Sequence, residues 1–144
     1  MLSSWVAGLT LPTWLTLLAN GVALQSAGYL MGLGIVCWAR QALARRFLLA
    51  HASTPGRHAL ELGLRFVVGL AWVGHAPNAA LPGAATVLGL VLVTTTLGLA
   101  LVPWRWHQAL AARSVPRVLG HLGWIGWGAA LGGVALAALA WRYD

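Results

Sequence analysis

Long apolar stretches dominate this chain, and the longest polar interruption runs from Arg40 to Arg57. No charged side chain precedes that interruption. About 20 apolar residues in a helix cross the ~30 Å hydrocarbon core of a bilayer. The pattern therefore predicts an all-α integral membrane protein in which four transmembrane helices form a compact bundle, over residues 13–38, 59–75, 81–102 and 118–141.

The uncharged amino-terminal stretch is too long for one straight span, because a helix rises about 1.5 Å per residue. Pro12 suits the first turn of a helix, so we expect residues 1–11 to form an interfacial segment ahead of the first span. The alternative is a tight hairpin at Asn20-Gly21, which would add a fifth helix.

The polar interruption itself predicts two local structures. Its first part, residues 40–50, reads as an amphipathic helix on the membrane surface, with Leu43 and Phe47 on the apolar side. Its second part contains Thr54-Pro55, where threonine is expected to cap the next helix and proline to occupy the first helical position.

Small residues recur at helical spacing in the predicted spans, where they let a neighbouring helix approach closely. We predict helix-packing seams of this kind in the first, third and fourth spans. Their residues are Gly21, Gln25, Gly28 and Gly32 in the first, Gly89, Val93, Thr96 and Ala100 in the third, and Gly126, Ala130, Gly133 and Ala137 in the fourth. A second pair in the fourth span, Gly128 and Gly132, lies on another face and predicts a second neighbour.

Composition supports the membrane class and bears on location. Hydrophobic residues make up 60% and charged residues 8%, whereas about a quarter of a soluble domain is charged. Every basic residue is arginine, which with heavy alanine, leucine and glycine usage is typical of a GC-rich bacterial genome. We therefore expect a protein of the bacterial inner membrane.

The arginines predict the orientation. Eight of nine lie within or near the two loops expected on one side, and only Arg142 lies on the other. By the positive-inside rule those loops are cytoplasmic and both termini periplasmic. The net charge is +7, and we expect it to attract anionic lipid headgroups and bound lipid. We expect no nucleic-acid partner. The residues expected at the headgroups are Arg40, Arg45, Arg46, Arg105, Arg113 and Arg117.

The five histidines are the first candidates for chemistry, because imidazole binds metals and haem. Four fall on the predicted cytoplasmic side with Glu61, but none is spaced i,i+4, so no metal site is predicted. These four are His51, His58, His107 and His121. The segment Ala71-x-x-x-His75 resembles the pigment-ligating pattern of bacterial light-harvesting polypeptides. That resemblance implies a pigment ligand at His75, and haem is the alternative ligand there. The residues themselves predict no cofactor.

The remaining polar and aromatic residues of the spans point to packing. Gln25 and Thr95 lie near mid-depth and are uncharged, so a neighbouring helix or the helix backbone can satisfy them. Trp124 and Trp127 lie inside the fourth span, where they predict contact with a partner protein or a lipid tail. The chain has no nucleophile beside a base and no phosphate-binding loop, so we predict no enzymatic activity.

These observations favour a noncatalytic accessory or structural subunit of a larger membrane complex, with other membrane subunits as partners. The first alternative is a small oligomeric transporter or channel with a pathway along Gln25 and Thr95. The second is a pigment- or haem-binding membrane subunit that uses His75.

Overall fold

The computed structural model describes residues 12–50 and 54–141, and this part of the chain contains α-helices and one 3-10 turn. The elements are α2 (Thr13–Ala39), α3 (Gln41–Ala50), α4 (Pro55–His75), η1 (Ala76–Asn78), α5 (Pro82–Ala100), α6 (Trp104–Leu119) and α7 (Leu122–Ala140). The expected interfacial segment, residues 1–11, lies outside the described residues.

Four of these segments are long and apolar enough to cross a membrane: α2, α4 with η1, α5 and α7. The protein is thus an all-α, multi-pass membrane protein, as the hydrophobic pattern predicts. Helix α2 continues without a break through Asn20-Gly21, so the hairpin alternative is wrong for this structure. Twenty-seven residues in one helix exceed the hydrocarbon thickness, and tilting accommodates such a length.

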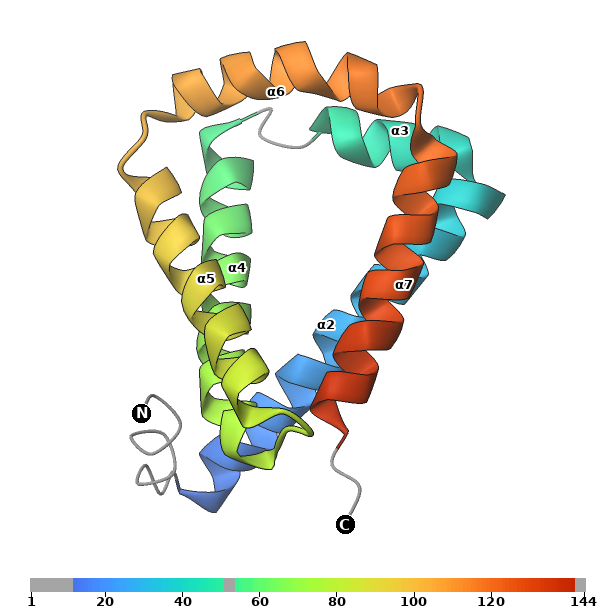
Figure 1. The fold of residues 1–144 in the computed structure, drawn as a ribbon. Coiled ribbons are helices and arrows are strands. Elements are labelled where there is room, and N and C mark those ends of the chain that lie inside the picture. The colour runs from blue at the N-terminus through green and yellow to red at the C-terminus, as the bar shows by residue number, and fades with distance from the viewer. Residues whose placement is uncertain (1–11, 51–53, 142–144) are drawn as a thin grey trace.

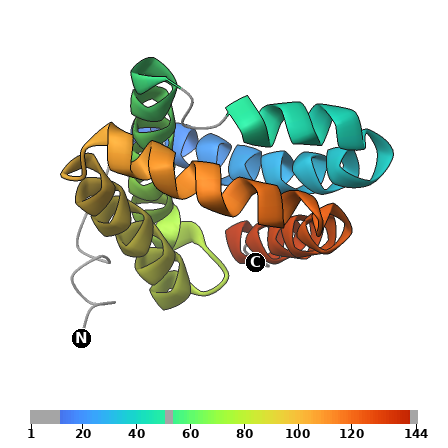
Figure 2. The same ribbon diagram turned by 90° about the horizontal axis from the view of Figure 1, so that it is seen from above.

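The spans are arranged in two pairs (Figure 1), α4 with α5 and α2 with α7. The pairs lie close together at the end that holds η1, and they diverge toward the opposite end. There α3 and α6 run across the bundle, and α6 bridges from α5 to α7 (Figure 2). The first described turn of α2 and the last turn of α7 both lie at the narrow end.

Alanine builds the core at the narrow end. Trp72 is fully buried there among Ala23, Ala76, Ala85 and Ala140, with leucine and valine side chains packed around them. Such small side chains let the helix backbones come close, so dispersion contacts and backbone proximity hold this end together.

The wide end has a second, smaller core of Cys37, Ala44 and Leu122. It joins α2, α3 and α7. Within α3, Ala44 is the buried residue, whereas Leu43 and Phe47 are 56% and 44% exposed. Leu48 packs against this core, whereas Leu43 and Phe47 are left at the surface, as expected for a helix that also contacts lipid.

The predicted start of the second span is confirmed in its capping residues, whereas the start of the fourth span differs from the prediction. The Thr54 hydroxyl accepts a hydrogen bond from the Arg57 backbone at 3.3 Å, and Pro55 is the first residue of α4, so the predicted cap is confirmed. The fourth span begins at Leu122 and not at residue 118, because α6 continues to Leu119 before the chain turns. The sequence pattern predicted no helix for α6.

Candidate functional site

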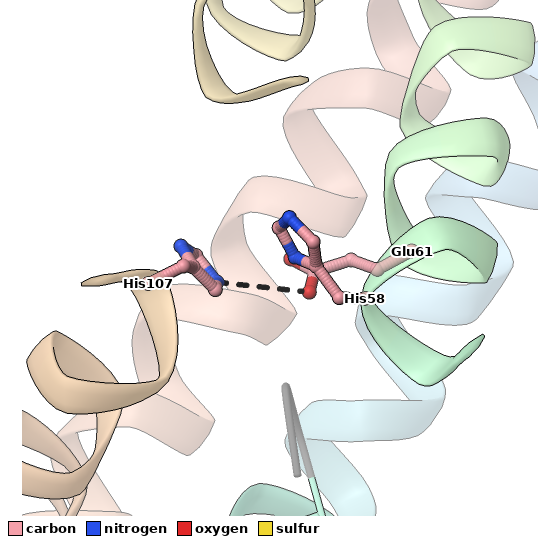
Figure 3. Close-up of side chains that lie close together, drawn as sticks. All are labelled: His58, Glu61 and His107. Carbon is pink, nitrogen blue, oxygen red and sulfur yellow. Dashed lines mark ion pairs between the residues drawn. The ribbon is translucent and has the colours of Figure 1, made fainter. Parts of the chain in front are cut away.

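Three potential metal ligands meet where α6 passes α4, although they come from distant parts of the chain (Figure 3). Capping at Thr54 starts α4 so that His58 and Glu61, three residues apart, share one helix face. Pro103 precedes α6 and places His107 in its first turns. One ligand atom from each of the three side chains lies within 4.8 Å of the other two.

This group, His58, Glu61 and His107, lies largely out of solvent. His58 is 6% exposed, and its Nδ1 is buried with no hydrogen-bond partner in the part of the chain that the structure describes. The rings of His58 and His107 are 4.7 Å apart between centroids and tilted by 35°. The His107 Nε2 is 4.0 Å from a Glu61 carboxylate oxygen, and both side chains are 16% exposed.

The sequence pattern predicted that these residues lie on the same side of the membrane, but it predicted no metal site. The structure brings three of them together, while His121 lies apart, with its Nδ1 3.1 Å from the Arg117 carbonyl. His51 is outside the described residues. The missed signal was the i,i+3 spacing of His58 and Glu61, because residues three apart also share a helix face.

His75 lies at the narrow end and joins three helices. Its Nδ1 is 2.6 Å from the side-chain oxygen of Asn20 in α2, and its Nε2 is 3.1 Å from the Ala140 carbonyl in α7. A carbonyl only accepts, so Nε2 carries a hydrogen and donates. If His75 is neutral, Nδ1 accepts a hydrogen bond from the side-chain NH₂ of Asn20, which means that the assigned oxygen and nitrogen of the Asn20 amide are exchanged. If His75 is protonated, Nδ1 donates a hydrogen bond to the Asn20 oxygen.

A pigment or haem at His75 remains a prediction, and its binding would require a change in the hydrogen bonds of this side chain. Both ring nitrogens already have partners, so an axial bond to a metal would displace either Asn20 or the Ala140 carbonyl. Trp72 packs edge-on against the His75 ring at 5.8 Å, and its Nε1 donates to the Ser26 hydroxyl at 3.1 Å. Ser26 donates in turn to the Ala23 carbonyl at 2.7 Å.

The seam of α7 packs against α2. A Cβ added to Gly133 would lie 2.6 Å from Met31 Cγ and 2.8 Å from the Ala27 carbonyl oxygen. A Cβ on Gly126 would meet the Trp38 indole nitrogen at 2.6 Å. The glycines thus permit a close contact, with Ala130 between them and Ala137 one turn after Gly133. Gly128, on another face of α7, meets nothing within 4 Å.

The α2 seam contacts no other helix of the described chain. A Cβ added at Gly21, Gly28 or Gly32 would find nothing within 4 Å. Gln25 is exposed on the same face, and it borders a surface hollow of about 440 Å³ lined by Leu17, Leu18, Gly21 and Val22. Helix α2 instead contacts its neighbours through Ala19, Ala23, Ala27 and Gly34.

Other candidate residues are satisfied locally or exposed. The hydroxyls of Thr94, Thr95 and Thr96 donate to carbonyls one turn earlier in α5, and Arg65 Nη2 lies 3.5 Å from the Thr95 hydroxyl. Trp124 and Trp127 are 78% and 56% exposed. The Trp127 ring packs edge-to-face against Trp38 of α2, with 4.7 Å between ring centroids. The exposed parts of both indoles can contact lipid or a partner.

The arginines expected at lipid headgroups gather at the wide end. Arg40 directly precedes α3, and Arg45 and Arg46 lie within this helix. All three are exposed. The remaining three lie on α6: Arg105, Arg113 and Arg117. Helix α6 has no buried residue.

The chain matches no protein-family model, and neither the curated proteins nor the solved structures gave a significant match.

Proposed function

We propose that this protein is a noncatalytic accessory or structural subunit of a larger membrane complex. The supporting observation is the outer face of α2, defined by Gly21, Gln25, Gly28 and Gly32. Nothing in the described chain covers it, although small residues at this spacing are what membrane helices use to approach one another. The face is suited to a transmembrane helix of another protein.

Gln25 strengthens the argument because its amide is exposed between apolar side chains. Leu24 and Tyr29 beside it are 46% and 57% exposed, so this part of α2 is surrounded by hydrocarbon in a bilayer. An amide in hydrocarbon costs free energy unless it forms hydrogen bonds. We therefore expect the partner helix to carry small residues and one polar side chain that bonds to Gln25.

The proposed location is the bacterial inner membrane, with both termini periplasmic. Arginine-bearing α3 and α6 lie at the wide end, and the positive-inside rule assigns such an end to the cytoplasm. Exposed Trp106 and Leu110 give α6 an apolar side for the lipid interface. Each arginine near an anionic surface adds about 1 kcal/mol of attraction.

A matched pair of substitutions tests the subunit proposal. Gly28→Leu places a large side chain on the outer face of α2, where the chain itself leaves room. The purified variant should keep its thermal stability but lose the proteins that copurify with wild type in mild detergent. Gly98→Leu is the control, because it adds the same side chain at an open glycine of α5 that belongs to neither face predicted to meet a neighbour.

Two results would overturn this proposal. One is an unchanged set of copurifying proteins in Gly28→Leu. The other is solute flux: if wild type reconstituted alone conducted ions or lipophilic cations, and Gln25→Leu abolished that flux at unchanged stability, the transporter alternative would replace the subunit.

A further inference from the structure

We propose that His58, Glu61 and His107 form a binding site for one divalent transition-metal ion, with Zn²⁺ the best match. The site joins the start of α4 to the start of α6 at the wide end of the molecule (Figure 3). It is independent of the proposed partner face on α2.

The first argument is the burial of His58. The residue is 6% exposed, and its buried Nδ1 has no hydrogen-bond partner in the described part of the chain. A buried polar atom without a partner is destabilising, and such atoms are rare in folded proteins. A metal ion is a partner that an imidazole nitrogen binds well, and it would remove this cost.

The second argument is the convergence of unlike donors. The three side chains arrive from two helices, and their ligand atoms fall within one sphere of metal-site dimensions. The His107 nitrogen and the Glu61 oxygen are 4.0 Å apart, which is too long for a hydrogen bond between them. The pair attracts directly only when His107 is protonated (dashed line in Figure 3). A central cation would attract both the Glu61 carboxylate and a neutral His107 imidazole.

The donor set selects the class of metal. Two imidazoles and one carboxylate suit Zn²⁺ and neighbouring transition metals, whereas Ca²⁺ and Mg²⁺ prefer oxygen ligands alone. Three protein ligands leave the fourth tetrahedral position of Zn²⁺ to water or another group.

Binding requires a small contraction. Ligands about 2.0–2.1 Å from a tetrahedral zinc are roughly 3.4 Å apart, compared with the 4.8 Å limit in this structure. Side-chain rotations of His107 and Glu61, each 16% exposed, can close the group around the buried His58. The ion would then fasten the surface helix α6 to the α4 span.

Metal titration of the tag-free, full-length protein in detergent tests the site. After chelator treatment, wild type should bind one equivalent of Zn²⁺, and Co²⁺ should give the visible absorption of a tetrahedral site. Zn²⁺ should also slow amide hydrogen exchange at the start of α6, because the ion ties this helix to α4.

The variants distinguish a built site from surface binding. His107→Gln should weaken Zn²⁺ binding at least ~10-fold, the lower end of the loss found even for outer-shell changes, and should remove the Co²⁺ bands. His121→Gln is the control and should bind as wild type, because His121 is exposed and outside the group. Glu61→Gln is the second ligand variant and should also weaken Zn²⁺ binding. His58 is left unchanged because it is buried, and its replacement could destabilise the protein.

Three outcomes would overturn the proposal: no stoichiometric Zn²⁺ or Co²⁺ binding by folded wild type, wild-type affinity in both His107→Gln and Glu61→Gln, or an equal loss in His121→Gln.

Discussion

Replacing Gly133 by alanine tests the contact that joins the first and last described spans. The new Cβ would lie 2.6 Å from Met31 Cγ, 2.8 Å from Met31 N and 2.8 Å from Ala27 O. The end of the Met31 side chain can move, but the two backbone atoms move only with α2 itself. Restoring a 3.4 Å contact requires a displacement of roughly 0.6–0.8 Å, and a gap of that size forfeits a quarter to a half of a dispersion contact.

The matched control is Gly128→Ala in the same helix, where the added Cβ meets nothing within 4 Å. Both variants gain the same helix propensity, about 1 kcal/mol, so this effect cancels between them. Overpacking of a tight contact costs about 1–3 kcal/mol. Gly133→Ala should therefore be less stable than Gly128→Ala by about 1–3 kcal/mol.

Reversible unfolding in mixed detergent micelles, followed by circular dichroism, measures this difference in the free energy of unfolding. Equal stability of the two alanine variants would refute the reasoning, because it would mean that α7 does not approach α2 through Gly133.

Two further predictions concern the narrow end and the orientation. Asn20→Leu removes a partner of the buried His75, which should cost about 1–3 kcal/mol in the free energy of unfolding; an unchanged midpoint in the same assay would contradict the hydrogen bond. Asp144→Cys in a Cys37→Ala background should react with an impermeant maleimide in intact cells, and its protection there would reverse the proposed orientation.

The spans could be predicted because hydrophobic length alone decides what crosses a bilayer. The start of α4 was equally readable, since Thr54-Pro55 combines a capping hydroxyl with a residue that needs no amide hydrogen bond. Helix α6 was missed because its apolar residues are interspersed with arginine and its helix contains Pro116. Its hydrophobic signal is therefore much weaker than that of a span.

The sequence did not predict which face of small residues contacts another helix of the same chain. Helix α2 has Gly21, Gly28 and Gly32 on one face and Ala23 and Ala27 on another, and both faces permit close packing. The structure uses the alanine face inside the chain. Periodicity identifies a seam, but the choice between two seams depends on the shape of the neighbouring helix.

The histidine and glutamate group illustrates a different limit. His58 and Glu61 share a helix face by spacing alone, whereas the position of His107 depends on how α6 crosses the bundle. That crossing follows from the lengths of α5 and α7 and from the turns at both ends of α6, so no local pattern in the sequence encodes it.

The hydrogen bonds of His75 also order the events of biogenesis. The ribosome makes α2 and α4 well before α7, so Asn20 and His75 enter the membrane while the carbonyl of Ala140 has yet to be synthesised. During this interval the two side chains can bond to each other but not to the third helix. Closure of the narrow end must therefore wait until the translocon has released α7, which makes the docking of this helix a late step of assembly.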